Sequence, residues 1–264
     1  MSGLTDDKLL YLKKNNIPQL MEHILQCLST DMPKSPVRYI GELMKRPVPP
    51  RIILIGAPGS GKATQCKVIA QKYNVVHICA NELLQDAIDN GSEEGQIAAE
   101  HMENEEPVPA SIIGQIVVRR MEQDDVREKG WLLSGFPTSH LQAATLELHG
   151  IAPHAFIVLD LPDDVVFQRV EHRRRDPVTG AVYHLLFNPP PPDNMELRGR
   201  LVQRSDEEHA EVSSRLHSYR MIVDELMERY VGISHVVDAN QSIVNVSKGV
   251  LDAVESSLLR CAEN

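Results

Sequence analysis

The chain has 264 residues, of which 42% are apolar and 24% charged, and its net charge is −10 at pH 7. This length can bury a substantial core and suits one globular domain with appendages. The acidic balance argues against a broad nucleic-acid surface, and no apolar run approaches the length of a membrane span. The N-terminus carries no secretory signal pattern. Cys27, Cys66, Cys79 and Cys261 form no CxxC motif, so we expect reduced, mostly buried thiols in an intracellular protein.

Residues 1–46 are predicted to form a separate helical unit. Apolar side chains recur there at helical spacing, with Pro18 in the first turn: Ile17, Leu20, Met21, Ile24, Leu25 and Leu28. A turn over residues 29–34 leads to Ser35-Pro36, which could cap a second short helix. Two helices this small cannot bury their own apolar faces. They would pack either on the main domain as a helical hairpin or on another chain. Residues 47–50, Pro-Val-Pro-Pro, indicate a stiff linker.

Residues 56–64, with the sequence GAPGSGKAT, lie between four apolar residues and a segment of helical periodicity. Strand, glycine-rich loop and helix is the order of a phosphate-binding loop. The glycines allow a tight turn that aims several backbone N–H groups at one anion, and the helix dipole adds to this attraction. Lys62 would reach the terminal phosphates as a mobile charge. Ala63 stands where most such loops place a Mg²⁺-binding hydroxyl, which Thr64 could supply. A glycine-rich turn without a ligand is the alternative.

From residue 51 onward, strands and helices alternate. The predicted strands cover residues 51–55, 75–79, 131–133, 155–161 and 235–238. Such alternation indicates an α/β fold, a P-loop NTPase-type parallel sheet with helices on both faces. Ligands bind at the carboxyl ends of the strands in such sheets. Four segments fall at these ends: the loop at Gly56, Ala80-Asn81, Ser134-Gly135 and the segment after Leu161.

The alternation breaks at about residues 175–203, where a turn signal, one short strand over residues 181–187 and four prolines occur. A long insertion without a helix is usually a functional lid or is disordered. Arginines bracket it, which suggests one concentrated anion site in an acidic chain: Arg169, Arg173, Arg174 and Arg175 before it, and Arg198, Arg200, Arg204 and Arg215 after it. For Arg175, Arg198 and Arg200 we expect solvated surface charges instead.

Residues 51–264 resemble the adenylate kinases, within the nucleoside monophosphate kinases. Residues 56–65 resemble the family motif GxPGxGKGTQ, with Ala63 for its last glycine, and residues 172–184 resemble the lid sequence. Residues 135–142 resemble GFPRxxxQ, and residues 204–207 with Arg215 resemble RxDD…R. At the N-terminus, residues 11–18 with Leu28 and Pro36 resemble the dimerisation and docking helices of the regulatory subunits of cAMP-dependent protein kinase.

The adenylate kinase resemblance implies a role for each matching residue. Lys62 and the loop amides would hold the β- and γ-phosphates, and Arg169 would stack on the ATP adenine. Lys62, Arg173, Arg204 and Arg215 would be catalytic, because phosphoryl transfer needs positioning and charge neutralisation and no general base. The implied ATP-binding residues are Gly56, Pro58, Gly59, Ser60, Gly61, Lys62, Ala63, Thr64, Arg169, Arg173, Tyr183 and His184. Mg²⁺ would accompany ATP, with Thr64 as a weak ligand. Lid closure would exclude water, and a lid without cysteines does not match the zinc-bearing variant.

The acceptor region, about residues 80–109 together with residues 135–142, departs from the family pattern. Ala80 replaces a threonine that touches AMP, and Gln85 and Thr138 replace the two arginines that bind its phosphate. Ser134 replaces an aspartate of the Mg²⁺ water shell. Gln142 and the Val108 carbonyl, which would recognise adenine, are retained. The implied AMP-binding residues are Ala80, Gln85, Val108, Gly135, Thr138, Gln142, Arg204 and Arg215.

The favoured interpretation is therefore an enzyme that converts ATP and AMP to two ADP, with reduced efficiency toward the acceptor. Two alternatives are an ATP-binding pseudo-kinase that serves as a structural or signalling partner, and phosphoryl transfer to another small acceptor. The expected partners are ATP, a nucleoside monophosphate, and either a second copy or a partner helix at residues 1–46. The expected location is cytoplasmic, with cilia or flagella suggested only by analogy with docking helices.

Overall fold

The computed structural model describes residues 8, 11–12, 17–44, 49–104, 106–204 and 207–263. The chain divides into two compact units, one of residues 1–49 with 260–264 and one of residues 50–259. Parts of three predictions lie outside the described residues: residues 13–16 of the docking-like motif, residues 47–48 of the linker and residues 205–206 of the RxDD-like segment. No helix within the described ranges has the length and apolar character needed to cross a membrane.

The first unit contains two helices, α2 (Ile17–Asp31) and α3 (Pro36–Leu43). Helix α2 continues two residues beyond the predicted start of the turn at residue 29, so that boundary was wrong. Ser35 occupies the N-cap position of α3, but its side chain accepts no capping hydrogen bond. Within residues 8–49, Ile24 is the one apolar side chain described as buried. Several apolar side chains of the two helices are exposed, among them Met21, Leu25 and Val37.

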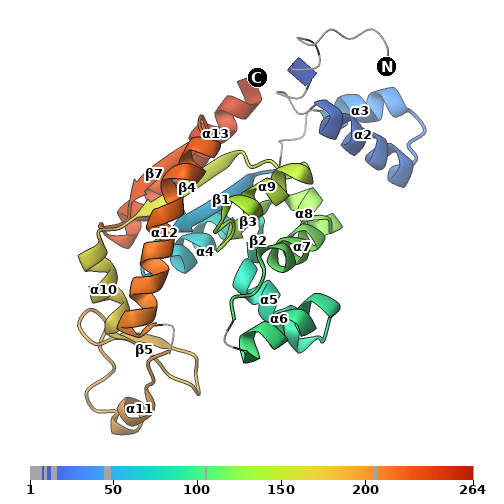
Figure 1. The fold of residues 1–264 in the computed structure, drawn as a ribbon. Coiled ribbons are helices and arrows are strands. Elements are labelled where there is room, and N and C mark those ends of the chain that lie inside the picture. The colour runs from blue at the N-terminus through green and yellow to red at the C-terminus, as the bar shows by residue number, and fades with distance from the viewer. Residues whose placement is uncertain are drawn as a thin grey trace. The chain divides into compact units, whose positions relative to one another are not determined.

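The second unit is built on a five-stranded parallel sheet in the order β2-β3-β1-β4-β7. Its strands are β1 (Arg51–Gly56), β2 (Val76–Cys79), β3 (Trp131–Ser134), β4 (Ala155–Asp160) and β7 (Ser234–Asp238). All five were predicted to within two residues at each end. The buried strands are nearly continuous apolar runs, as expected for strands covered on both faces. Strand β1 lies at the centre, so the loop that follows it emerges from the middle of the sheet (Figure 1).

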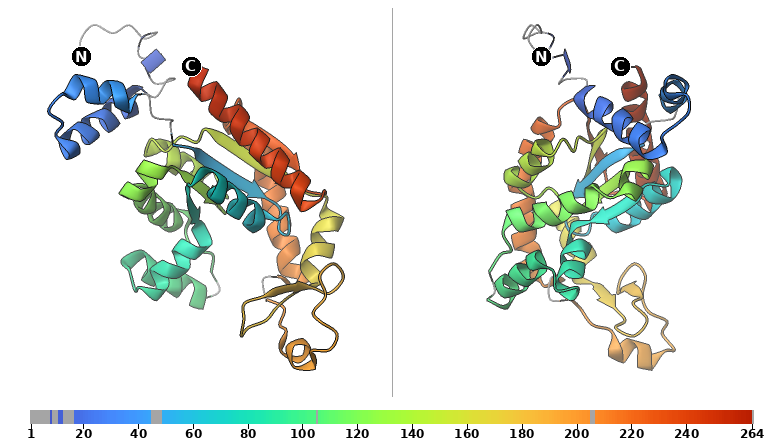
Figure 2. Two further views of the ribbon diagram at one scale, coloured as in Figure 1. Left: turned by 180° about the vertical axis from the view of Figure 1, so that it is seen from behind. Right: turned by 90° about the vertical axis from the view of Figure 1, so that its right-hand side faces the viewer.

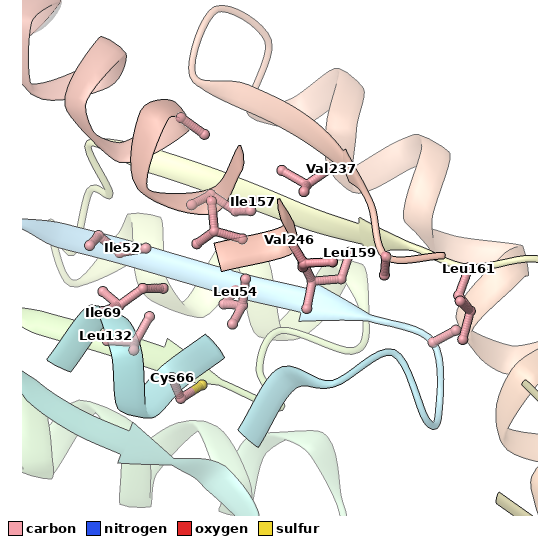
Figure 3. Packing of buried hydrophobic residues seen from close by; sticks show 14 of the residues in the cluster. Ile52, Leu54, Cys66, Ile69, Leu132, Ile157, Leu159, Leu161, Val237 and Val246 are labelled. Carbon is pink, nitrogen blue, oxygen red and sulfur yellow. The ribbon is translucent and has the colours of Figure 1, made fainter. Parts of the chain in front are cut away.

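Helices cover both faces of this sheet, as predicted. One face packs against α4 (Lys62–Tyr73), α10 (Asp163–Glu171) and α13 (Ile243–Glu263). Figure 3 shows part of this cluster, with Ile69 of α4 and Val246 of α13 on the side of Ile52 and Leu54 of β1. The other face packs against α7 (Ala110–Met121), α8 (Asp124–Lys129) and α9 (His140–Leu148). Helix α12 (His209–Arg229) contributes apolar residues to both clusters.

Two smaller elements project from the same end of the sheet in each view of the molecule (Figure 2). One is the helix pair α5 (Ala80–Asp89) and α6 (Glu93–Glu103), which follows β2. The other is the predicted insertion, with the antiparallel strands β5 (Arg173–Arg175) and β6 (Val182–His184). The insertion also contains helix α11 (Met195–Arg200), so the prediction of an insertion without a helix was wrong. Asn194 caps α11, since its side chain accepts a hydrogen bond from the backbone N–H of Leu197 at 2.9 Å.

The cysteine prediction holds in part. Cys27, Cys66 and Cys79 are free thiols, and Cys66 is buried whereas Cys27 and Cys79 are half-buried. The side chain of Cys261 is outside the described part of the chain. Burial raises the pKa of the Cys66 thiol to about 11, so it behaves as a small apolar side chain beneath the phosphate-binding loop.

Candidate active site

The glycine-rich loop joins the centre of the sheet to α4. Gly59 and Gly61 have φ values of +73° and +89°, a backbone conformation that side chains rarely adopt, and Gly61 is the N-cap of α4. A Cβ atom at Gly56 would lie 2.7 Å from the Ser60 hydroxyl and 2.8 Å from the Leu159 carbonyl oxygen. The three glycines are therefore required by backbone geometry and close packing, and the loop delivers the N-terminus of α4 to the carboxyl end of β1.

Lys62 folds back over this loop. Its Nζ atom donates hydrogen bonds to the carbonyl oxygens of Gly56, at 2.7 Å, and Ala57, at 2.8 Å. The pKa of Lys62 is lowered to about 8, mainly by burial and in part by the nearby positive charges of Arg215 and Arg173. The lysine and two of the arginines predicted to be catalytic therefore share one electrostatic environment at the end of β1. Such a concentration of positive charge is costly without an anion and favours phosphate binding.

Arg169 lies beside the same loop. Its guanidinium donates to the Ala239 carbonyl oxygen at 3.0 Å and approaches the Gly59 carbonyl oxygen at 3.5 Å. It therefore joins α10 to the phosphate-binding loop and to the turn after β7. This location agrees with a site next to ATP, although stacking on the adenine stays a prediction.

A buried carboxylate holds Arg173. The Nε atom of Arg173 donates to Oε1 of Glu207 at 2.7 Å, and Nη2 donates to the same oxygen. The Glu207 side chain is only 3% exposed. Its backbone is fixed as well, because Glu207 N–H donates to the Arg204 carbonyl at 3.0 Å and the Gln203 amide donates to the Glu207 carbonyl at 2.8 Å. The sequence did not reveal this ion pair, which spans 34 residues.

A second ion pair closes the insertion and corrects the prediction for Arg200. Its Nε and Nη2 atoms each donate at 2.8 Å to the Asp176 carboxylate, which is fully buried. The hydroxyl of Thr179 also donates to Asp176, at 2.6 Å. These donors, with Arg200 the strongest, lower the pKa of the Asp176 carboxyl below its ordinary value. Arg200 is therefore a structural residue of the lid and not a solvated charge, whereas Arg175 and Arg198 are exposed as expected.

His184 and Tyr183, predicted to bind ATP, lie in strand β6. The Nε2 atom of His184 lies 3.0 Å from the Gln168 carbonyl oxygen, and its Nδ1 atom accepts from the N–H groups of Leu186 and Phe187 at 3.2 Å. The ring therefore joins the lid to α10 in its neutral form, which is a structural role that the sequence did not indicate. Tyr183 is opposite Arg174 in the β5–β6 ladder. Contacts of either residue with ATP stay predictions.

The acceptor region has little positive charge. Residues 80–118 contain no lysine or arginine. Ala80 begins α5 and is buried, and Gln85 is exposed with its amide donating to Asp89 at 2.8 Å. Val108 is half-buried just before the N-cap of α7. Gly135 follows β3 with a φ of +74°, and no described atom lies within 4 Å of where its Cβ would be.

Thr138 and Gln142 contact each other at the start of α9. The Gln142 side chain is 4% exposed, and its Oε1 atom accepts from the Thr138 backbone N–H at 2.6 Å and the Thr138 hydroxyl at 3.0 Å. Helix α9 packs on α7, where Gly114 meets Thr145. The two residues predicted to contact the acceptor are thus coupled to each other.

Ser134 is paired within the site. It occupies the position of the family's Mg²⁺-associated aspartate, and its hydroxyl lies 2.9 Å from Nε2 of His77. Within the described residues, no cluster of three or more His, Cys, Asp or Glu side chains could hold a metal ion. Thr64 is exposed in the first turn of α4, next to the phosphate-binding loop, so its hydroxyl fits the weak contact predicted for a magnesium ion bound with ATP.

The comparisons with known proteins agree on one family. The family profile described as adenylate kinase matches residues 54–234. The adenylate kinase of Trypanosoma brucei rhodesiense is 46% identical over 191 residues, which cover 72% of this chain and 91% of that protein. The chloroplastic adenylate kinase of Zea mays is 43% identical over 195 residues, 74% of this chain and 87% of that protein.

Human adenylate kinase 8 is 31% identical over 265 residues, which cover 97% of this chain and 54% of that protein. This match includes most of residues 1–46, and the chain spans about half the length of that relative. Together with the parallel sheet and the glycine-rich loop, these matches identify the family: the chain belongs to the adenylate kinases.

Proposed function

We propose that this chain transfers the γ-phosphoryl group of MgATP to AMP, giving two molecules of ADP. The observation that carries this proposal is the position of Lys62 over the phosphate-binding loop, with Arg173 and Arg215 near enough to lower its pKa. These groups can neutralise the charge that develops on the transferred phosphoryl group, which is the main requirement of this reaction. A pure ATP-binding protein needs no such cluster.

Magnesium supplies further charge neutralisation on the phosphates of ATP when it is bound. The protein's own residues orient the reactants. Lys62 and the loop amides would hold the phosphates of ATP, and Arg173, Arg204 and Arg215 would surround the transferring group. Release of Arg173 from Glu207, or movement of both together, would be needed for contact with phosphate. The lid would exclude water during the transfer.

The experiment that tests this function is an acceptor panel. The purified chain with MgATP is supplied with AMP, CMP, UMP or GMP, and ADP formation is followed by a coupled spectrophotometric assay. We expect transfer to AMP above all others. Tight binding of ATP without transfer to any acceptor would refute the proposal and favour an ATP-binding pseudo-kinase. Efficient transfer to a different monophosphate would reassign the acceptor.

We also propose that residues 1–46 bind a second copy of the chain through α2 and α3. Met21, Leu25 and Val37 in these helices are exposed, as are Met32 and Met44 directly after them, with exposed fractions of 51–83%. Packing against a second pair of helices would cover them. A cytoplasmic location stays a prediction from the sequence.

Sedimentation of full-length variants tests this dimer. Leu25→Lys with Val37→Lys places two charges on the exposed apolar surface and should give a monomer. Met102→Lys is the matched control, because Met102 is 53% exposed in the second unit, and it should leave the dimer intact. A wild-type monomer would refute the dimer. If the wild type, but not the double lysine variant, binds a helix from another protein, the segment docks a partner instead of a second copy.

A further inference from the structure

Strand β7 forms one edge of the parallel sheet, and its only neighbour among the described strands is β4 (Figure 1). At the two ends of their ladder, the carbonyl of Ile233 and the N–H of Ala239 bond to β4, at 2.9 and 2.7 Å. Residues two apart on a strand have their backbone groups on the same side, so residues 235 and 237 also face β4. The backbone groups of Ser234, Val236 and Asp238 therefore point away from β4.

The outer edge of β7 is open at its centre. Val236 is 59% exposed, and its N–H and carbonyl form no backbone hydrogen bond within the described chain. An exposed edge strand is a template for a further strand, and proteins commonly protect such an edge with lysine or proline. The sequence of β7, Ser-His-Val-Val-Asp, contains neither. The strand therefore presents backbone donors and acceptors to an extended segment.

A groove of about 620 Å³ lies along β7, between this strand and helix α13. The wall on α13 comes from one face of the helix and consists mostly of small side chains: Gly249, Asp252, Ala253 and Ser256. A Cβ atom at Gly249 would lie 3.2 Å from Cγ1 of Val237, so the helix and the strand approach each other closely there. The small side chains beyond this contact leave room for the side chains of an added strand.

The groove has a negative charge. Its lining includes the exposed carboxylates of Asp238 and Asp252 and contains no lysine or arginine. Lys248 lies one turn before Asp252 on α13, but outside the lining. Because side chains alternate along a strand and Val237 faces α13, Val236 lies on the opposite face of the sheet. A strand with basic side chains on the α13 side and apolar ones on the other would complement both faces.

We propose that the outer edge of β7 binds an extended segment of a partner protein in which basic side chains alternate with apolar ones. The segment would extend the sheet by one strand, with hydrogen bonds to the outward backbone groups of Val236 and Asp238. Its basic side chains would enter the groove toward Asp252, and its apolar side chains would cover Val236. None of these residues belongs to the predicted nucleotide sites, so binding can be tested without phosphoryl transfer.

The test measures binding of a fluorescein-labelled peptide of alternating lysine and valine to the full-length chain, by fluorescence anisotropy. Val236→Pro removes the outward N–H and places the proline ring on the open edge, a position that tolerates proline because β4 bonds to other groups. We expect the dissociation constant to rise at least about threefold, the effect of losing one neutral hydrogen bond. Val236→Thr keeps the N–H and the branched side chain, so it should bind nearly as the wild type does.

Asp252→Lys reverses the charge of the groove and changes no backbone group, so it decides the test if the proline variant fails to fold. It should weaken binding about threefold or more, the scale of an exposed ion pair and its reversal. Asp224→Lys is the matched control, because Asp224 is an exposed carboxylate of α12 outside the groove and its reversal changes the net charge equally. This control should bind the peptide nearly as the wild type does.

Three binding results would overturn the proposal: no binding by the wild type, unchanged binding by a folded Val236→Pro variant, or equal effects of the two charge reversals. Sedimentation of the chain without peptide tests the other occupant of this edge. If Val236→Pro alone lowers the association state of the chain, β7 pairs with a second copy, and the proposal of a basic partner segment is overturned.

Discussion

Restoring positive charge to the acceptor site should improve AMP as a substrate. The wild type offers the AMP phosphate no cation from residues 80–118, and Gln85 and Thr138 replace the family's two arginines. We therefore expect measurable activity limited by a high KM for AMP. In the double variant Gln85→Arg with Thr138→Arg, each guanidinium can form a charge-assisted hydrogen bond of about 1.5–3 kcal/mol. If both bonds form fully, the two arginines together stabilise the transition state by about 3–6 kcal/mol, which is a gain on the order of 10² to 10⁴ in kcat/KM.

The structure argues for the lower end of this range. Gln85 is exposed and lies one turn before Asp89, to which its amide already donates at 2.8 Å, so an arginine there would be shared between Asp89 and the phosphate. We expect a gain of at least about tenfold in kcat/KM for AMP, which corresponds to about 1.4 kcal/mol. The measurement is a coupled assay with varied AMP at saturating MgATP, and then with varied ATP. The KM for ATP should hardly change.

The matched control is Gln85→Met with Thr138→Met. It keeps the length of the Gln85 side chain, lengthens the side chain at Thr138 and removes the Thr138 hydroxyl bond without adding charge. A gain seen with the arginines and not with the methionines is therefore electrostatic. A wild type with a low KM for AMP, combined with no gain in the arginine variant, would show that other residues anchor the phosphate. Equal gains in both double variants would attribute the effect to side-chain size and refute the charge argument.

Three further predictions concern the donor side. Lys62→Met should abolish transfer while thermal unfolding stays close to the wild type; near-normal kcat would show that Lys62 has been misassigned. Arg204→Ala and Arg215→Ala should each lower kcat far more than ATP affinity, because their contacts strengthen in the transition state; equal losses would indicate ground-state binding. Because burial and neighbouring arginines lower the pKa of Lys62 to about 8, its charge is lost as pH rises through that value, so kcat/KM for ATP should fall above pH 8. Lys62→Arg should lack this decline at high pH, and a decline in both would assign it to another group.

The sheet could be predicted because its strands are buried on both faces and therefore appear as apolar runs between helical segments. The glycine-rich loop could be predicted because its backbone needs glycine at Gly59 and Gly61, a requirement confirmed by their positive φ values. The order of the strands could not be predicted from these patterns alone. The neighbours β1 and β4 are separated in sequence by six helices and two strands, and pairing at that separation depends on the complete fold.

The ion pairs were missed for the same reason. Arg200 pairs with Asp176 across 24 residues, and Arg173 pairs with Glu207 across 34. Charge patterns in the sequence identify clusters of arginines but not which of them a buried carboxylate will hold. The contact of Thr138 with Gln142 is different, because the residues are four apart at the start of α9. A side chain that can donate, placed four residues before a glutamine at a helix N-terminus, was a signal available in the sequence.

The distribution of charge between the two sides of the site has a consequence for how the substrates bind together. Lys62, Arg173 and Arg215 share one environment at the phosphate-binding loop, whereas residues 80–118 contribute no cation. The arginines that surround the ATP phosphates would then be the cations that also contact the AMP phosphate. In that case AMP is bound through its base on one side and through the donor-side arginines on the other. The base contact at Gln142 then provides selection, and the arginines provide neutralisation at the moment of transfer. On this reasoning, replacement of the two family arginines weakens the binding of AMP alone more than it weakens stabilisation of the transition state. The arginines retained for catalysis act on both phosphates in the transition state.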